Sequence, residues 1–308
     1  MRTDRSISDA FFPEEVIAVI FSVPILVIQF IFILQHRITD VSSFITPLIS
    51  FLIFTAYVIY LRKSKNRAVL FFRSWLHIPY YGIIFTAFQT FIHKLNPHDW
   101  DAFLLNTDKA LFGTDITVWL EHFNSGIVTE ILIIMYFSYY LLPTLSFVVF
   151  YFNKRSDNSY CDIRIFILAL IIGWYLAFVF YAIFPASGPD SAFPGHYTTE
   201  LKGLSPLTAL YLDKVTSYLR ESQVRNTFPS MHFGIILMVN YFAFKLRRRY
   251  FWLCTLPLGT GLGIATLYLR QHYLIDLVGS VFMAWFSIYL SGRLYKRKTS
   301  EVLKTSEV

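Results

Sequence analysis

The chain has 308 residues, of which 55% are hydrophobic, 19% are aromatic and only 15% are charged. About a quarter of the residues in a soluble globular chain are charged, so this composition and the mean hydropathy of +0.50 exclude a secreted enzyme, a disordered chain and a soluble nucleic-acid-binding protein. The net charge of +7 is therefore interpreted as a topology signal of a membrane protein.

Eight stretches of the chain are candidates for membrane-spanning helices. A helix needs about 17–25 mostly apolar residues to cross the hydrocarbon core of a bilayer. The stretches are Val16–Leu34, Phe44–Leu61, Leu76–Ile92, Val128–Phe152, Ile165–Phe184, Met231–Phe244, Phe251–Tyr268 and Leu274–Leu290. The Met231 stretch is short, and we expect it to begin near Pro229. The first stretch has no cleavage site after it, so we expect an uncleaved span and not a signal peptide.

Positive charges gather in alternate loops and predict the orientation of the spans. Membrane proteins carry an excess of Lys and Arg in their cytoplasmic loops. With the N-terminus inside, the cytoplasmic segments hold Arg62, Lys63, Lys65, Arg67, Arg73, Lys154, Arg155, Arg164, Lys245, Arg247, Arg248, Arg249, Arg293, Lys296, Arg297 and Lys298. We therefore predict an all-α integral membrane protein with about eight transmembrane helices and both termini in the cytoplasm.

The predicted organisation has three parts. Residues 1–75 hold two transmembrane helices, residues 76–295 hold a bundle of six helices, and residues 296–308 form a polar cytoplasmic tail. Two outer segments, His93–Ile127 and Pro185–Thr227, are too long to be simple turns. Loops of this length usually carry function or contain a helix of their own.

Two segments bring ionisable residues to the edge of a predicted span, where such groups are costly. One is Thr227–His232, which opens the sixth span, and the other is Leu269–Asp276, which opens the eighth. Both spans run from outside to inside, so both segments lie at the same outer face. Helix N-termini present unpaired N–H groups and a partial positive charge, which suit a phosphate. The Ser230 hydroxyl would bind the same anion.

His272 and Asp276 are four residues apart, so they share one face of a helix. A carboxylate in that position accepts a hydrogen bond from Nδ1–H of the imidazole and leaves Nε2 free as a base or nucleophile. A second histidine, His232, would then protonate a leaving group. The plain alternative is two interfacial histidines that are satisfied by backbone carbonyls, but their common face and the presence of Asp276 favour catalysis.

Neither a metal centre nor a disulfide is expected. His93 and His98 are separated across a proline, and no third ligand accompanies them. Cys161 and Cys254 fall in a predicted inner loop and inside an apolar span, and their spacing does not resemble a zinc pattern.

The two histidine segments resemble a known family. Pro229-Ser230-Met231-His232 and the later His272-xxx-Asp276 are similar to the Pro-Ser-Gly-His and Ser-Arg-xxxxx-His-xxx-Asp motifs of the type 2 phosphatidic acid phosphatase superfamily. Within it, Phe228-Pro229-Ser230-Met231-His232 and His272-Tyr273-xx-Asp276 most resemble the inositol phosphorylceramide synthase branch. The segment from Phe184-Pro185 to Gly188-Pro189 resembles a proline-rich motif of that branch.

The resemblance implies specific roles for the catalytic residues. His272 would attack phosphorus and become a phosphohistidine, Asp276 would orient it, and His232 would protonate the leaving oxygen, with no metal or cofactor. The chain lacks the superfamily's Lys-xxxxxx-Arg-Pro motif, and Ala265-Thr266 stand where Ser-Arg would be. We therefore assign phosphate binding to other cations, which are Arg270 and Arg225, with Lys202 and Arg220 behind them.

The resulting hypothesis is a multi-pass membrane lipid phosphatase or phosphotransferase that acts on a lipid phosphate ester or diphosphate at the non-cytoplasmic face. An alternative is an inositol phosphorylceramide synthase-type transferase, which would move a phospho-headgroup to a lipid alcohol. A second alternative is a non-catalytic lipid transporter, although the chain lacks the inverted repeat of many transporters. The expected partner is a membrane lipid substrate and not nucleic acid. The sequence predicts neither the lipid nor the oligomeric state.

Overall fold

The computed structural model describes residues 11–64, 66–152, 159–222 and 224–305, and over these residues it contains helices and no strand. The described residues pack as two compact units, one made of those within 11–91, 144–175 and 285–305, and one made of those within 92–143 and 176–284. Among the cations named above, those outside the described residues are Lys65, Lys154 and Arg155, together with the side chains of Arg67, Arg220, Lys296, Arg297 and Lys298.

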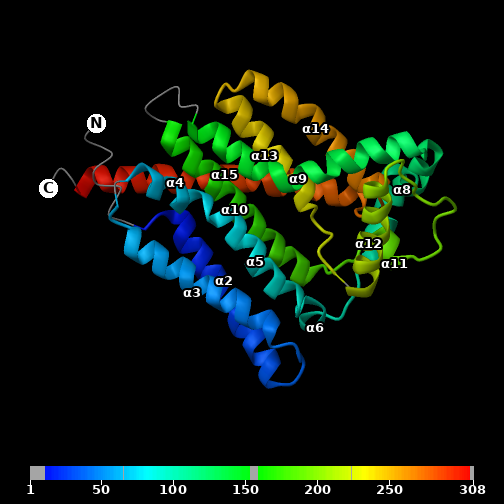
Figure 1. Ribbon diagram of the computed structural model, residues 1–308, viewed down its shortest axis with the longest axis horizontal. Coiled ribbons are helices and arrows are strands. Elements are labelled where there is room, and N and C mark those ends of the chain that lie inside the picture. Colours follow the sequence, from blue (N-terminus) through cyan, green and yellow to red (C-terminus); the bar gives the residue numbers. More distant parts are fainter. Residues whose placement is uncertain (1–10, 65, 153–158, 223, 306–308) are drawn as a thin grey trace. The chain divides into compact units, whose positions relative to one another are not determined.

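Figure 1 shows the helices in chain order. They are α2 (Pro13–Leu34), α3 (Ser42–Leu61), α4 (Arg67–Trp75), α5 (His77–Gln89), α6 (Ile92–Leu95), α7 (Asp101–Phe112), α8 (Ile116–Trp119), η1 (Leu120–Phe123), α9 (Gly126–Phe152), α10 (Ser159–Ile183), α11 (Pro189–Ala192), α12 (Pro206–Ser222), α13 (Met231–Lys245), α14 (Arg249–Tyr268) and α15 (Leu274–Thr305).

Each of the eight predicted spans coincides with a helix of the described chain, but two of these helices are short. α2, α3, α9, α10, α14 and α15 are long and apolar enough to cross a membrane by length and composition. α5 has 13 residues, because the chain turns at Leu76 between α4 and α5. α13 has 15 residues and begins at Met231, not near Pro229, because Ser230 is its extended N-cap residue.

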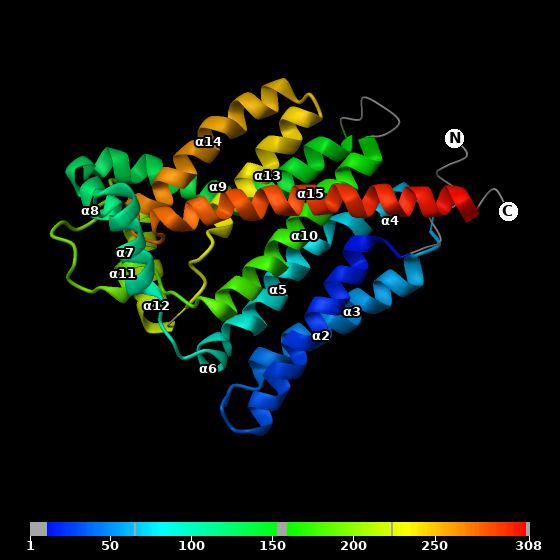
Figure 2. The same ribbon diagram turned by 180° about the vertical axis from the view of Figure 1, so that it is seen from behind.

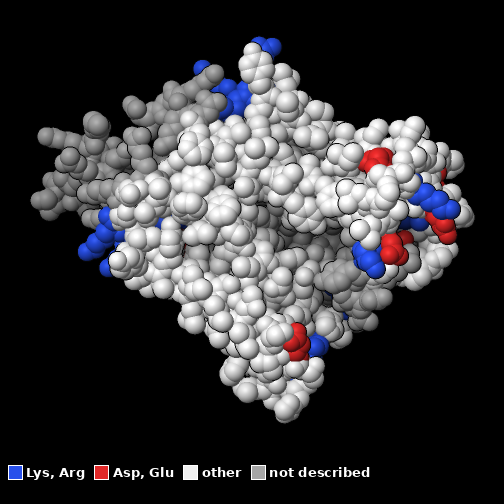
Figure 3. All heavy atoms as spheres, in the orientation of Figure 1, with Lys and Arg blue, Asp and Glu red and all other residues white. Residues whose placement is uncertain are grey.

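Exposed apolar side chains cover the outside of several candidate spans. On α3, Leu52, Ile53 and Tyr60 are 55%, 64% and 86% exposed. The face shown in Figure 3 is largely uncharged over the described atoms. Soluble proteins rarely expose apolar surface on this scale. With the six long apolar helices, this surface identifies a multi-pass membrane protein.

The two long segments between predicted spans, His93–Ile127 and Pro185–Thr227, contain helices. The first holds α7, which ends where Gly113 adopts a left-handed conformation with φ of 76°. Glycine is the residue that ends helices in this conformation at least cost. The second holds α11 and α12, and α11 contacts both α7 and α12 in the second unit (Figure 2). These segments therefore form an ordered layer in the unit that carries both histidine motifs.

The first unit contains a buried cluster of charges. Arg73 donates from Nε and Nη2 to the Glu15 carboxylate at 2.8 and 2.9 Å. Arg164 pairs with Glu14 and donates from Nε to the Tyr295 hydroxyl at 2.7 Å. Buried charges persist in proteins when they are paired. The interpretation of Arg73 and Arg164 as loop cations is therefore corrected, because both guanidinium groups are buried against acids of α2.

Breaking the Arg73–Glu15 pair should destabilise the protein. We expect Arg73→Met to lower the free energy of unfolding by about 3–5 kcal/mol, because the Glu15 carboxylate would remain buried without its partner. Unfolding of the purified protein in mixed micelles measures this change. The double variant Glu15→Gln/Arg73→Met removes both charges and should recover part of the loss. Equal losses in the single and double variants would contradict this account.

Candidate active site

The two predicted histidine segments lie side by side at the starts of α13 and α15. The Ser230 N–H donates to the Asp276 carbonyl oxygen at 3.2 Å. The Ser280 hydroxyl contacts the carbonyl oxygens of Ser230 and Asp276 at 2.6 and 2.7 Å. The first turns of the two helices are thus joined by hydrogen bonds, although they are far apart in the sequence.

This junction brings His232, His272 and Asp276 into one hydrogen-bonded row. Nδ1 of His232 lies 3.1 Å from Nε2 of His272, and Nδ1 of His272 lies 3.1 Å from Oδ2 of Asp276. The hydroxyl of Tyr136, on α9, lies 3.0 Å from Nε2 of His232. Neither predicted motif contains Tyr136, and the sequence offers no signal for it except its place on a predicted span.

The Asp276 carboxylate determines where the protons of this row lie. Oδ2 accepts from the Tyr273 N–H at 2.8 Å, and as a carboxylate oxygen it can also accept from Nδ1–H of His272, which lies 3.1 Å away. Burial lowers the pKa of the His272 imidazole to about 3, so the ring is neutral and its Nε2 carries a lone pair. With the Nδ1 proton of His272 assigned to Asp276, Nδ1 of His232 donates to that lone pair, and Nε2 of a neutral His232 accepts from the Tyr136 hydroxyl.

Two carboxylates of α7, which the sequence analysis did not identify, hold the segments around His272. Asp108 accepts from the N–H groups of Leu274 and Ile275, both at 2.7 Å. Burial raises the pKa of Asp108, and these two N–H donors oppose that rise. In the sequence, the two α7 carboxylates could have been noticed by their spacing, because Asp101 and Asp108 are seven residues apart on one amphipathic helix.

Asp101 binds the proline-rich segment and the residue that follows His272. Its carboxylate accepts from the N–H groups of Ser187 and Gly188 at 2.8 and 2.9 Å and from the Tyr273 hydroxyl at 2.7 Å. Gly188 has φ of 91°, and a Cβ atom there would lie 2.5 Å from the Gln271 carbonyl oxygen. Glycine is therefore needed for the close approach of the two segments.

The start of α15 differs from the predicted phosphate site. Its first backbone N–H groups, on Leu274 and Ile275, already donate to Asp108, and the preceding Tyr273 N–H donates to Asp276. Two carboxylates thus take the place that the sequence analysis gave to an anionic substrate. At α13 the Ser230 hydroxyl is buried and caps its own helix by accepting from the Phe233 N–H at 3.5 Å.

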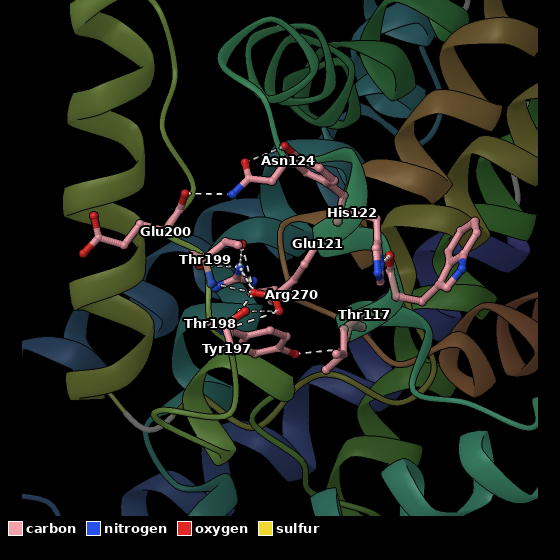
Figure 4. Close-up of polar contacts among 12 residues, drawn as sticks. Thr117, Glu121, His122, Asn124, Tyr197, Thr198, Thr199, Glu200 and Arg270 are labelled. Carbon is pink, nitrogen blue, oxygen red and sulfur yellow. Dashed lines mark hydrogen bonds and ion pairs between the residues drawn. The ribbon is translucent and has the colours of Figure 1, made fainter.

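Arg270 is held by protein partners (Figure 4). Its Nη2 donates to Oε1 of Glu121 at 3.0 Å and to the Thr199 carbonyl oxygen at 2.7 Å. Its guanidinium lies 3.9 Å from the centre of the Tyr197 ring. Burial raises the pKa of Glu121, but hydrogen bonds from Thr199 and Thr198 outweigh burial and leave that pKa below its ordinary value. Arg270 and Glu121 therefore hold in place the segment that contains residues 197–199.

The other predicted phosphate ligands are also paired with the protein. Nη2 of Arg225 lies 3.2 Å from Oδ2 of Asp99. The Lys202 ammonium lies 3.2 Å from the Glu200 carboxylate, and both side chains are exposed. Phosphate binding by Ser230, Arg225 and Arg270 stays a prediction.

A cavity of about 690 Å³ lies beside Arg270 in the second unit. Charged side chains of both signs line it, namely Asp190, Glu200, Asp213, Lys202 and Arg270, together with Tyr197 and Thr199. Leu201, Ala209 and Leu212 add apolar surface, so the cavity is mixed in character and offers polar groups to a headgroup. Over the described residues, no group of three or more His, Cys, Asp or Glu side chains is arranged to hold a metal ion.

The chain is similar to known proteins over more than half of its length. The model of the PAP2 superfamily matches residues 102–290, which include both histidine motifs. A PA-phosphatase related-family protein of Dictyostelium discoideum is 21% identical over 302 residues, covering 86% of this chain and 54% of the relative. The chain therefore spans about half the length of this curated relative. No solved structure matches the chain.

Removing the Asp108 carboxylate should loosen the start of α15. We expect Asp108→Ala to lower the free energy of unfolding by about 1–3 kcal/mol for each N–H group left buried without an acceptor. Asp108→Asn is the matched control, because it keeps one acceptor oxygen and should lose about half as much. Thermal unfolding in detergent measures both. An Asp108→Ala variant as stable as the wild type would contradict the capping role.

A double-mutant cycle distinguishes two roles for Arg270. In one, it pairs with Glu121 and holds residues 197–199 in place; in the other, it binds the substrate phosphate directly. If Arg270 acts by pairing with Glu121, the variants Arg270→Gln and Glu121→Gln should lower kcat/KM by similar factors. The double variant should then be little worse than either single variant, because residues in direct contact are not additive. A loss with Arg270→Gln that far exceeds the loss with Glu121→Gln, through a raised KM, would indicate a phosphate ligand.

Proposed function

This chain belongs to the PAP2 superfamily, and from that membership and the row of His232, His272 and Asp276 we propose that it is a membrane enzyme that transfers the phosphoryl group of a lipid phosphate ester or diphosphate through a phosphohistidine. The observation that carries the proposal is the hydrogen-bonded contact of both histidines at 3.1 Å, with Asp276 behind His272. A nucleophile, its orienting carboxylate and an acid are thus adjacent.

The first chemical step forms an N–P bond and breaks a P–O bond. Substrate binding breaks the hydrogen bond between the two histidines and moves the rings apart, so that the phosphoryl group lies between them and the Nε2 lone pair of His272 attacks phosphorus. The anionic phosphate favours a protonated His232, which takes up a solvent proton and then gives its Nδ1 proton to the leaving oxygen. His272 keeps its Nδ1 proton, and the carboxylate of Asp276 stabilises the positive charge that develops on the ring.

The second step regenerates the enzyme. Nδ1 of His232 now carries a lone pair and accepts a proton from water or from an alcohol, whose oxygen attacks phosphorus as the N–P bond breaks. Water as the acceptor makes the enzyme a phosphatase, and a lipid alcohol makes it a phosphotransferase. Both reactions use the same three residues, so the acceptor decides between them.

The substrate is proposed to be a membrane lipid that approaches from the non-cytoplasmic leaflet. The supporting observations are the candidate spans with lipid-facing side chains and the basic segments at the opposite ends of α13 and α14. The Dictyostelium relative is named a PA-phosphatase related-family protein, so phosphatidate is the first donor to test.

A transferase of the inositol phosphorylceramide synthase type is the second candidate. The segment Phe228-Pro229-Ser230-Met231-His232 favours it, because it resembles the corresponding motif of that branch. The cavity beside Arg270 has room for a headgroup. A non-catalytic lipid transporter is less well supported, since transport does not require a carboxylate that orients a histidine.

Phosphate release by the detergent-purified protein tests the proposal. We expect release from at least one of phosphatidate, phosphatidylglycerol phosphate and an isoprenyl diphosphate. His272→Ala should abolish it, with a loss of at least about 10³-fold, because the nucleophile is absent. Asp276→Asn is a useful companion, because it keeps the shape of the side chain and should cost less than His272→Ala.

Two outcomes would change the assignment. If no phosphate is released, phosphatidylinositol as donor and a ceramide as acceptor should yield a His272-dependent transfer product, which would favour the transferase. Turnover that is unimpaired in a folded His272→Ala variant would contradict the phosphohistidine mechanism for either enzyme. Unfolding midpoints of wild type and variant serve as the folding control.

A further inference from the structure

His232 has a partner on each of its ring nitrogens, and one of them comes from a helix outside both motifs. Nδ1 faces His272, whereas Nε2 faces the Tyr136 hydroxyl of α9 at 3.0 Å. The Tyr136 ring also stacks on the imidazole, with centroids 4.9 Å apart and an angle of 29° between the planes. Tyr136 is 5% exposed. Stacking and hydrogen bonding together restrict both the position and the rotation of the imidazole.

We propose that Tyr136 is a positioning residue that keeps Nδ1 of His232 directed at the reacting oxygen throughout the catalytic cycle. The inference rests on the proposed function, because it assigns Tyr136 a role in the protonation of the leaving group. Tyr136 acts through His232 and does not itself touch the phosphoryl group.

A phenol suits this role because its oxygen both donates and accepts hydrogen bonds. In the resting row, Tyr136 donates to the lone pair on Nε2 of neutral His232. When His232 takes up a proton at Nε2, the hydroxyl rotates and its oxygen accepts from the new Nε2–H. A carboxylate could only accept, and an ammonium group could only donate. Tyr136 can therefore hold the ring in the neutral and the protonated state without changing partners.

The proton count follows from these two states. His232 enters phosphoryl transfer with protons on both nitrogens and gives the Nδ1 proton to the leaving oxygen as the P–O bond breaks. It is then neutral, with its remaining proton on Nε2 held by the Tyr136 oxygen, and the Nδ1 lone pair faces the incoming water. After Nδ1 takes a proton from water, His232 returns the Nε2 proton to solvent and the resting row is restored.

Without the Tyr136 hydroxyl, Nε2 would lose its partner and the ring could rotate or exchange tautomers. The loss should fall on the step that needs a proton at the leaving oxygen. An aryl phosphate leaves as a stable phenolate and needs little help from an acid, whereas an alkyl phosphate needs a proton on its leaving oxygen. The two substrates therefore separate the loss of acid catalysis from a general loss of structure.

The experiment compares Tyr136→Phe with Tyr139→Phe in the full-length detergent-purified protein. Tyr139 lies on the same helix and packs its ring 4.3 Å from the His232 ring, and the described contact between these residues is made by the rings alone. Each variant is assayed with phosphatidate and with p-nitrophenyl phosphate, and kcat/KM is measured for both. Tyr139→Phe is thus a control for the loss of a hydroxyl from a tyrosine ring that packs against the same imidazole.

We expect Tyr136→Phe to lower kcat/KM for phosphatidate by about 10- to 100-fold, part of the roughly 10²–10⁴-fold that general acid catalysis contributes. The loss with p-nitrophenyl phosphate should be much smaller, and Tyr139→Phe should stay within about threefold of the wild type for both substrates. Equal losses for both substrates in Tyr136→Phe, or equal behaviour of the two variants, would overturn the proposal.

A measurement on the wild-type protein keeps the inference testable if Tyr136→Phe does not fold. With ¹⁵N-labelled histidine and a His232→Gln variant to assign the signal, NMR reports which nitrogen of resting His232 carries the proton. We expect Nδ1, and a proton on Nε2 would overturn the proposal. The NMR result does not depend on turnover, so a wild type without phosphatase or transferase activity would refute the proposed function while leaving this test intact.

Discussion

The hydrogen bond between Nδ1 of His272 and the Asp276 carboxylate is the interaction on which the site depends. Both side chains are buried, so the carboxylate needs donors, and the His272 ring must present its proton to it. That requirement leaves the Nε2 lone pair of His272 facing His232 at 3.1 Å. One carboxylate thus sets the tautomer of two imidazoles and the direction of the Tyr136 hydroxyl beyond them.

α7 supplies the scaffold that keeps this row in place. Asp101 binds the backbone of the proline-rich segment, and Asp108 caps the start of α15.

Arg270, between α14 and α15, has a left-handed φ of 59°, a conformation that costs energy for residues other than glycine. Its ion pair with Glu121 helps to hold that conformation two residues before His272. The carboxylates of Asp101, Asp108, Glu121 and Asp276 therefore lie around a site whose proposed substrate is an anion.

Sequence predicted the helices from apolar length and the His272–Asp276 pair from its four-residue spacing, which are local signals, whereas His232 was joined to them through the topology of the spans and the family resemblance. It did not predict Tyr136 or Asp108, since their roles depend on contacts with residues more than 90 positions away. The same dependence on distant contacts explains why Arg73 and Arg164 were interpreted as loop cations. A cation beside an apolar stretch looks like a loop residue until the acids of α2 that pair with it are known.

The most direct test of the account is to locate the phosphoryl group on the enzyme. Brief reaction with labelled phosphatidate, alkaline quenching to preserve acid-labile phosphohistidine, digestion and mass spectrometry identify the modified residue. The account predicts a phosphoryl group on His272, with more of it in a His232→Ala variant if loss of the base slows the second step. A phosphoryl group on His232, or steady phosphate release without any phosphoenzyme, would contradict it.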